Sequence, residues 1–408
     1  MIDEWKQILR DSILSPSQLR EKFPTLSFSP QLEEVTREFP MRVNRYYASL
    51  IQQQGDPIWT QCIPDERELS DRYGQEDPLN EEGDSPVPHL THRYPDRVLL
   101  LVSNQCAMYC RFCTRKRKVG RDHSITPATV QAGIDYIARH PEVRDVVVSG
   151  GDPFFLRDEV IDSILKRLRA IPHLEIIRIH TRMPVVLPQR ITPELCAILK
   201  RYHPLYVNTH FNSPRECTEE AKKACWMLAD AGIPLGNQAV LIKGVNDTPE
   251  AFKELCQKLL QMRVRPYYLY QADLVRGIEH LRTPVQVGVD LMRSLRGHTS
   301  GMAVPQFVVD APGGGGKIPL SPNYIVERDG AYLVLENYEG NRYVYPDEAL
   351  RMVKGQDEIP AETVQQADSP VSVPLTLVGR PCRRRYVDVE STTQQPIRAR
   401  RARSSRGH

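Results

Sequence analysis

The sequence contains no apolar run of about 18 residues, so it offers no candidate membrane-spanning helix. Its first residues, MIDEWKQILRDSIL, mix both charge signs and lack the apolar core of a signal peptide. Net charge is only +3 over 408 residues, which argues against a general polyanion binder. Nine cysteines without a secretion signal favour a reducing compartment, and we therefore expect a cytoplasmic protein.

A fourth ligand is missing where three of the cysteines cluster. The stretch NQCAMYCRFCTRKR, residues 104–117, holds Cys106, Cys110 and Cys113 at C-x3-C-x2-C spacing. A structural zinc ion would need another Cys or His nearby, and the basic run that follows offers none. Thiolates at this spacing suit a [4Fe–4S] cluster, in which each iron takes one thiolate. Three cysteines would leave one iron open to a small molecule.

Short apolar runs alternate with amphipathic helical stretches from residue 97 onward. Six such βα units, at a spacing of about 30 residues, predict a parallel sheet wrapped by helices as an open or closed barrel. Polar residues and glycines follow the runs, at the end of the strands where parallel barrels carry their active sites. The runs are 97–103, 145–151, 175–181, 205–211, 235–241 and 265–271.

The flanking segments differ in composition from this region. Residues 1–60 predict an N-terminal helical extension, and residues 61–96, polar and proline-rich, predict an extended connection. We place the barrel at 97–300 and a C-terminal β segment, with a glycine-rich turn and a hairpin, at 301–354. Residues 355–408 include nine arginines and predict a disordered tail. No nucleic-acid-binding fold accompanies these arginines, so we do not expect nucleic acid as a partner.

Two further motifs could contact small molecules. In VVVSGGDPF, Gly150 and Gly151 would let the backbone approach a ligand closely, and Asp152 could accept hydrogen bonds from an ammonium group. Asn208, His210 and Gln238, which lie toward the ends of other predicted strands, are candidate contacts for the same ligand.

The second motif, DAPGGGGK, is not a P-loop, because the glycine spacing fails and Ile318 follows the lysine. Four glycines predict a mobile or close-approach backbone that leaves Lys317 on a flexible arm. A lysine so placed can form a Schiff base, as in pyridoxal phosphate enzymes. The alternative is a lysine that merely follows a loose turn.

The cysteine spacing after the first barrel strand, with Phe112 before the last cysteine, resembles the radical S-adenosylmethionine superfamily. Longer stretches resemble one family, lysine 2,3-aminomutase, over roughly residues 1–350. They are HRYPDRVLLLVSNQCAMYCRFCTRKR, SGGDPF, YYLYQADLVRGIEH, LRGHTSGMAVPQFVVDAPGGGGK and PNYIVERDG. The resemblance implies an α/β fold, a partial (β/α)6 TIM-like barrel of the radical S-adenosylmethionine type.

The resemblance also implies an isomerase that converts L-lysine to β-lysine by moving the amino group from C2 to C3. Its cofactors would be a [4Fe–4S] cluster, S-adenosylmethionine and pyridoxal 5′-phosphate. The reaction would pass through a pyridoxal aldimine and a 5′-deoxyadenosyl radical, with S-adenosylmethionine bound at the open iron and its methionyl amine at the GGD turn. An electron donor such as flavodoxin or ferredoxin would reduce the cluster.

Residue roles carry over by position. Lys317 would hold pyridoxal phosphate, with Arg93, Tyr94 and Arg97 near its ring and phosphate. Arg115 would bind the substrate carboxylate, and some of its neighbours in TRKRK are expected to be solvated. Asp273 and Asp310 would receive the distal ammonium of lysine, because two enclosed carboxylates call for a cation. The alternatives are a helix-capping Asp273 and an Asp310 that simply ends a strand.

The sequence departs from the family at its zinc site. Known members carry a zinc cysteine after the GVND turn and three more near the C-terminus, whereas here Thr248 follows the turn and the tail holds only Cys382. We therefore predict no structural zinc, which puts the usual tetramer in doubt, while the helical N-terminus is compatible with a homodimer. Alternative functions are an aminomutase for another basic amino acid such as arginine, the branch that makes β-lysine for a translation factor, and a non-catalytic iron–sulfur or RNA-binding protein.

Overall fold

The structure is a computed structural model that describes residues 4–121, 125–329 and 332–347. Contacts place these residues in a unit that ends at Arg351. Cys382 and the arginine-rich tail lie outside the described residues, so the prediction made for them stays a prediction. No helix in the described ranges is long and apolar enough to cross a membrane.

A nine-stranded sheet forms the centre of this unit, with its strands in sequence order. Strands β2 to β8 pair in parallel, whereas β1 and β9 are antiparallel to their neighbours at the two edges. The six predicted strands are confirmed as β2 to β7, and β8 adds a seventh parallel strand. The strands are β1 Leu90–Tyr94, β2 Arg97–Ser103, β3 Asp145–Gly150, β4 Ile176–His180, β5 Leu205–Thr209, β6 Leu235–Leu241, β7 Arg265–Gln271, β8 Gln306–Ala311 and β9 Gly316–Leu320.

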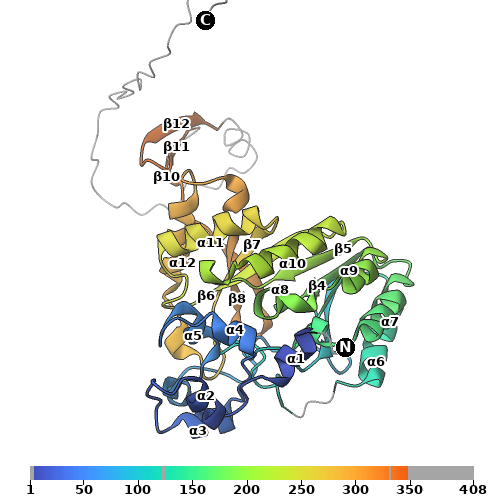
Figure 1. The fold of residues 1–408 in the computed structure, drawn as a ribbon. Helices are drawn as coiled ribbons and strands as arrows, with labels where there is room; N and C mark the ends of the chain where they lie inside the picture. The colour runs from blue at the N-terminus through green and yellow to red at the C-terminus, as the bar shows by residue number, and fades with distance from the viewer. Residues whose placement is uncertain (1–3, 122–124, 330–331, 348–408) are drawn as a thin grey trace, which may run out of the picture. The chain divides into compact units, whose positions relative to one another are not determined.

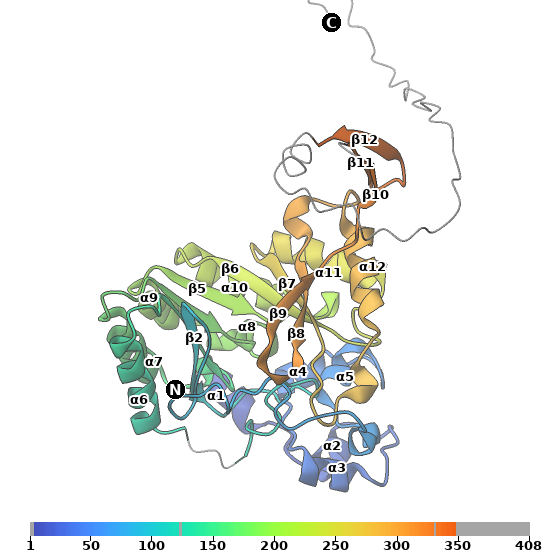
Figure 2. The ribbon, with the colours of Figure 1, turned by 180° about the vertical axis from the view of Figure 1, so that it is seen from behind.

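The two edge strands meet at one hydrogen bond. The backbone N–H of Lys317 in β9 donates to the Tyr94 hydroxyl at the end of β1, at 2.9 Å. This contact brings the ends of the sheet together, so the sheet is a nearly closed barrel. Figure 2 shows β8 and β9 running beside β7. The segment 61–96, predicted as an extended connection, also contains regular structure, namely β1 and the 3-10 helix η1, Glu66–Ser70.

Helices cover the outer side of the sheet, as Figure 1 shows. Three of them begin at a Thr-Pro pair, in which the threonine side chain accepts a hydrogen bond from the third helical amide and proline occupies the first helical position. The capping threonines are Thr126, Thr192 and Thr248. The helices are α6 Pro127–Arg139, α7 Asp158–Arg169, α8 Met183–Val186, α9 Pro193–Lys200, α10 Glu219–Asp230, α11 Pro249–Gln261 and α12 Val285–Leu295.

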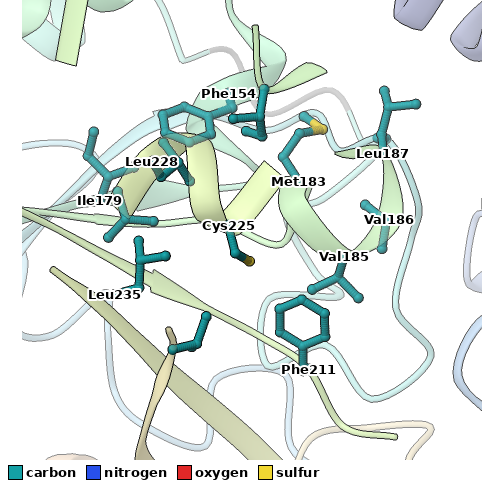
Figure 3. Packing of buried hydrophobic residues seen from close by; sticks show 14 of the residues in the cluster. Phe154, Ile179, Met183, Val185, Val186, Leu187, Phe211, Cys225, Leu228 and Leu235 are labelled. Carbon is teal, nitrogen blue, oxygen red and sulfur yellow. The ribbon is translucent and has the colours of Figure 1, made fainter. Parts of the chain in front are cut away.

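The core between sheet and helices is built from aliphatic and aromatic side chains. Figure 3 shows Ile179 of β4 and Leu235 of β6 facing Leu228 of α10, with Phe154 and Phe211 from the loops after β3 and β5. All five side chains are at most 7% exposed. Because outward-facing side chains of the strands fill this layer, the inward-facing side chains are left to line the barrel interior.

An N-terminal extension and a small second sheet complete the described chain. The extension consists of five short helices, in agreement with the helical prediction for residues 1–60. The hairpin predicted through EGN is confirmed as β11–β12, which pairs with β10 in a three-stranded sheet. The elements are α1 Glu4–Arg10, α2 Pro16–Lys22, α3 Leu32–Glu38, α4 Arg45–Ser49, α5 Pro57–Cys62, β10 Ile325–Asp329, β11 Tyr332–Glu336 and β12 Arg342–Pro346.

Candidate active site

A cavity of about 1000 Å³ runs along the inner side of the curved sheet. Its lining combines residues from the sheet with residues from the loop after β2. Every site residue singled out from the sequence lines this cavity, namely Arg93, Tyr94, Arg97, Cys106, Cys110, Cys113, Arg115, Gly150, Gly151, Asp152, Asn208, His210, Gln238, Asp273, Asp310 and Lys317. The structure thus brings together groups that lie far apart in the chain, while the role of each group stays a prediction.

The three clustered cysteines lie in the cluster loop, residues 104–121, directly after β2. Burial raises the pKa of Cys113 to about 11, and the neighbouring Cys110 adds to that rise. Burial and the nearby Asp152 carboxylate raise the pKa of Cys106 well above its ordinary value. None of the described cysteines forms a disulfide. Enclosed thiols of this kind stay protonated until a metal displaces the proton.

No three His, Cys, Asp or Glu side chains among the described residues converge as ligands of a single metal ion would. That geometry does not conflict with a [4Fe–4S] cluster, because each cysteine of such a cluster binds a different iron. The donor set fits the cluster in number and in chemistry, with three thiols on one cavity wall and no fourth cysteine in that lining.

The N-terminal extension holds the cluster loop through its backbone. The carbonyl of Arg42 accepts a hydrogen bond from the N–H of Tyr109 at 2.9 Å, and the carbonyl of Gln61 accepts one from the N–H of Arg111 at 2.9 Å. The loop lacks regular secondary structure, so it depends on such partners to satisfy its backbone. No motif in the sequence indicates that the extension would supply them.

The glycines of the SGGDPF turn serve the chain's own packing. A Cβ at Gly150 would lie 2.2 Å from the carbonyl oxygen of Ser103, and one at Gly151 would lie 2.4 Å from that of Gln105. The sequence suggested that these glycines admit a ligand to the backbone. The structure shows that Gly150 admits the end of β2 and that Gly151 admits the cluster loop, so the turn and the loop form one wall of the cavity.

Asp152 also makes local contacts. Its carboxylate accepts hydrogen bonds from the Thr181 hydroxyl at 2.7 Å and from the backbone N–H groups of Phe154 and Arg182 at 3.0 and 2.8 Å. Burial nevertheless raises its pKa to about 6, against the effect of these donors. These contacts give Asp152 a structural reason to be buried, besides the ligand contact predicted from the sequence.

Lys317 lies in strand β9 rather than on the flexible arm that the sequence predicted. Gly313, Gly314 and Gly316 adopt φ values of 71°, 94° and 80°, which only glycine adopts without strain. The glycine run therefore makes a tight connection between β8 and β9. In the resulting register Lys317 lies opposite Asp310, and its Nζ is 3.2 Å from Asp310 Oδ1.

The residues predicted to bind pyridoxal phosphate gather at the β1–β2 hairpin. Tyr94 and Arg97 form a cross-strand pair there, and the Arg97 guanidinium lies 3.8 Å from the centre of the Tyr94 ring. Arg93, whose side chain is 14% exposed, donates from Nε to Asp84 at 2.8 Å. The hydrogen bond from Lys317 to Tyr94 links this group directly to the lysine.

The basic run TRKRK is largely enclosed, which corrects the expectation that some neighbours of Arg115 are solvated. Its four basic side chains between 115 and 118 are at most 20% exposed. Segment 61–96 supplies the carboxylates that make this possible, because a buried cation needs a paired anion. The pairs are Arg115–Glu81, Lys116–Glu68, Arg117–Glu81 and Lys118–Glu82, at 2.6–3.1 Å.

Arg115 keeps one donor free. Its NH2 group pairs with Glu81, whereas its Nε is buried and has no hydrogen-bond partner among the described residues. Burial lowers the pKa of the Arg115 guanidinium, but Glu81 outweighs that effect and leaves the pKa raised. A buried, unpaired N–H on the cavity wall suits an anionic group of a ligand.

Two carboxylates face the same cavity. Asp273 accepts a hydrogen bond from the Thr114 hydroxyl at 2.7 Å, and Asp310 pairs with Lys317. Burial raises the pKa of Asp273 to about 6, the charge of Asp310 adds to that rise, and Lys317 and Arg115 oppose it. An additional cation at this place would stabilise the ionised pair. The two alternatives read from the sequence, a helix cap and a strand end, do not explain this burial.

Neutral polar groups occupy the middle strands. The pKa of His210 is lowered to about 3 by burial and by the charges of Arg182 and Arg115, and the pKa of His180 is lowered well below its ordinary value by burial and by Arg178. Asn208 Nδ2 lies 3.1 Å from His180 Nε2. At neutral pH both imidazoles are therefore uncharged, and they can exchange hydrogen bonds with a ligand without adding charge.

Sequence reasoning missed several residues that line the cavity. Arg178 forms a two-bond pair with Asp145 at 2.9 Å, Arg182 reaches Cys110, and Tyr270 lies beside Lys317. Gln271 has a buried Oε1 without a hydrogen-bond partner in the part of the chain that the structure describes. A signal was present for Arg178, because a charged residue inside the apolar run EIIRIHT points to the barrel interior.

Comparisons with known proteins agree with this geometry. Residues 100–259 match the Radical SAM superfamily and residues 292–372 match the family Lysine-2,3-aminomutase. The chain is 52% identical to L-lysine 2,3-aminomutase of Acetoanaerobium sticklandii, over 85% of each chain. It is 47% identical to L-lysine 2,3-aminomutase of Methanococcus maripaludis, over 92% of each chain. It is also 47% identical to glutamate 2,3-aminomutase of Clostridioides difficile, over 79% of this chain and 77% of that one.

The superfamily implies a [4Fe–4S] cluster and S-adenosylmethionine, which suit the three thiols and the adjoining polar wall. Identity of this extent over most of the chain confirms the resemblance seen in the sequence, and with it the barrel fold and the isomerase class. The chain belongs to the lysine 2,3-aminomutase family of the radical S-adenosylmethionine superfamily.

Proposed function

We propose that this chain is an L-lysine 2,3-aminomutase. The reaction moves the amino group of lysine from C2 to C3 and a hydrogen from C3 to C2, so substrate and product have the same atoms and the same oxidation state. One observation carries the proposal: a single cavity contains the three thiols, Lys317 and the enclosed Asp273–Asp310 pair. Each of these groups serves a different requirement of the reaction.

Cys106, Cys110 and Cys113 would hold the cluster, and the adjoining SGGDPF turn, Asn208, His210 and Gln238 would contact S-adenosylmethionine. We further propose that the site holds pyridoxal 5′-phosphate at Lys317. When bound, the cluster and S-adenosylmethionine supply a radical that removes hydrogen, and pyridoxal phosphate delocalises an unpaired electron. The chain's own contribution is to hold these groups near one another and to exclude water.

Pyridoxal phosphate fits the wall that surrounds Lys317. The Tyr94 hydroxyl holds the Lys317 backbone, and Arg93 and Arg97 place two guanidinium groups on the cavity. Arginine suits phosphate because its planar fork donates two parallel hydrogen bonds. Tyr270, whose ring centre lies 5.4 Å from Lys317 Nζ, offers a flat surface beside the lysine.

The substrate would bind between opposite charges. The free Nε of Arg115 would meet the α-carboxylate, while Asp273 and Asp310 would meet the distal ammonium. The ammonium of Lys317 lies 3.2 Å from Asp310, which supports this carboxylate as a site for a primary amine. A glutamate side chain would bring a third carboxylate to the pair, and that is unfavourable. Arginine remains the alternative substrate because a guanidinium also pairs with carboxylates.

Three further proposals concern the setting of the reaction. Reduction of the cluster calls for a low-potential one-electron donor such as flavodoxin or ferredoxin. The short helices of the N-terminal extension are compatible with a homodimer. The free thiols of the described cysteines suit a reducing compartment, and we propose the cytoplasm. Reduction of the cluster by purified flavodoxin would test the donor. Analytical ultracentrifugation would test the homodimer, and cell fractionation would test the compartment.

Product analysis tests the function. The chain would be reconstituted anaerobically with iron and sulfide, reduced, supplied with S-adenosylmethionine and pyridoxal phosphate, and offered L-lysine, L-arginine or L-glutamate separately. β-Lysine as the main product is the expected result. β-Arginine as the main product would keep the reaction class and overturn the substrate, and a lack of any β-amino acid would contradict the proposed function.

The pH dependence of turnover tests the Asp273 assignment. Because the pKa of Asp273 is raised to about 6, its carboxylate is ionised above that pH and neutral below it. Lysine binding needs the ionised form, so kcat/KM is expected to be level above pH 7 and to fall about tenfold per unit below pH 6. The Asp273→Asn variant should have a lower kcat/KM above pH 7 and should lose this inflection. An unchanged inflection in the variant would assign it to another group, such as Asp152.

A further inference from the structure

Arg182 lies in the loop directly after β4, and its guanidinium reaches the cavity wall behind the cluster loop. Its side chain is 8% exposed. One of its terminal nitrogens, NH1, lies 2.9 Å from the sulfur of Cys110 and donates to it. That sulfur stands for the thiolate that would bind iron. The contact therefore joins a permanent cation to a cluster ligand.

Acceptors on the other sides of the guanidinium fix its position. Nε donates to the carbonyl of His210 at 3.0 Å, and NH2 donates to Gln61 Oε1 at 2.5 Å and to Glu216 Oε1 at 2.7 Å. The Glu216 side chain is fully buried. These acceptors come from the N-terminal extension, the loop after β5 and the 3-10 helix η4, Pro214–Glu216. These acceptors hold Arg182 in place independently of the sulfur. They also fix the direction in which its NH1 group donates to Cys110.

These contacts place two opposite charges near the sulfur of Cys110. Arg182 contributes one positive charge at the thiolate, and Glu216 contributes one negative charge on the far side of the guanidinium. The cation is nearer to the sulfur than its counter-ion, so this pair of charges contributes a positive potential at the sulfur. In a buried site such charges are poorly screened. Hydrogen bonds to ligand sulfurs and nearby charge are among the factors that set the potential of an iron–sulfur cluster.

We propose that Arg182 is a positioning residue that raises the reduction potential of the cluster through its hydrogen bond to Cys110. The proposal rests on the proposed function insofar as the three cysteines must hold a cluster. Reduction adds one electron to the cluster from an external one-electron donor, and no proton or bond of Arg182 changes. The adjacent cation stabilises the added negative charge. It therefore stabilises the reduced cluster more than the oxidised cluster.

Redox titration of the reconstituted chain tests this proposal. The midpoint would be measured with dithionite as reductant, by the electron paramagnetic resonance signal of the reduced cluster, with iron and sulfide determined for every sample. Arg182→Gln is expected to shift the reduction equilibrium at least tenfold toward the oxidised form, which corresponds to about 59 mV for one electron. Glu216→Gln is expected to shift it in the opposite direction. Arg182→Lys keeps the charge, so its midpoint should lie nearer to that of the parent than the midpoint of Arg182→Gln does.

Arg190 provides the matched control. It is also a buried arginine, with a side chain 1% exposed, but it pairs with Asp158 at 2.5 Å and donates to the carbonyl of Phe154 at 2.8 Å. Arg190→Gln should therefore leave the midpoint unchanged. Equal shifts in Arg190→Gln and Arg182→Gln would indicate general loosening and would overturn the proposal, as would an unchanged midpoint in Arg182→Gln.

Two outcomes separate this proposal from the proposed function. If the parent chain takes up no cluster by iron and sulfide analysis, the cysteine assignment fails and the role of Arg182 fails with it. If the parent carries a cluster and forms β-lysine while the variants show no shift, only the role of Arg182 is overturned. Should Arg182→Gln not retain a cluster, the direction of the shift in Glu216→Gln decides, because a merely structural contact would not raise the potential.

Discussion

Turnover by a Lys317→Ala variant is expected to fall by on the order of 10³-fold or more, while the iron and sulfide content stays that of the parent. The reason is that Lys317 is the one lysine on the wall of the described cavity and, in the proposed function, the residue that attaches pyridoxal phosphate. Borohydride treatment of the parent chain followed by mass spectrometry should find the pyridoxyl group on the peptide that contains Lys317. The alanine variant should show none.

Two further variants separate this role from a charge effect. Lys317→Arg keeps a cation beside Asp310 but cannot attach the aldehyde of pyridoxal, so its turnover should be as low as that of the alanine variant. Lys243, an exposed lysine in the loop after β6, is the matched control, and Lys243→Ala should behave as the parent does. Substantial lysine turnover by Lys317→Arg would contradict the proposed role.

The second large effect concerns stability. Glu68→Gln is expected to lower the free energy of unfolding by about 3–5 kcal/mol, because it leaves two buried cations without their shared counter-ion. Glu68 is fully buried and accepts from Arg111 at 2.5 Å and from Lys116 at 2.7 Å. These two cations lower its pKa against the effect of burial, and burial lowers the pKa of Lys116 to about 8. Urea unfolding of the full chain would measure the change.

The effect should reach the active site, because Arg111 and Lys116 belong to the cluster loop. We expect Glu68→Gln to bind less iron and sulfide after reconstitution than the parent does. Glu175 is the matched control, since its pair with Arg144 is about half exposed on both sides. Glu175→Gln should leave the free energy of unfolding close to that of the parent, because solvent screens this exposed pair. Equal losses of stability in the two variants would contradict the structural role given to Glu68.

These two residues differ in how far the sequence reveals them. Lys317 follows a glycine run that is uncommon enough to be noticed, and its neighbours resemble a known family. Glu68 lies in a polar segment that reads as a connection. Its importance comes from two cations more than 40 positions away in the chain. Only folding places a carboxylate beside them, and for that reason the basic run looked like a solvated one.

The sequence by itself determined the periodic elements and the chemistry-bearing residues. Alternating apolar runs and helical stretches predict the parallel strands because side-chain periodicity follows directly from local backbone geometry. The spacing of Cys106, Cys110 and Cys113 indicates the cluster for a similar reason, since ligands close in sequence must be close in space. Family resemblance adds Lys317, Asp273 and Asp310 to the set.

Only the tertiary structure decided the contacts between distant segments. It places Lys317 in a strand opposite Asp310, packs Gly151 against the cluster loop, and sets Arg182 beside Cys110, 72 positions earlier in the chain. Such contacts depend on how the extension, the connecting segment and the strand ends meet around one cavity. Residue spacing along the chain does not reveal these contacts, because long-range packing and the pairing of buried charges arise only when the whole barrel has formed.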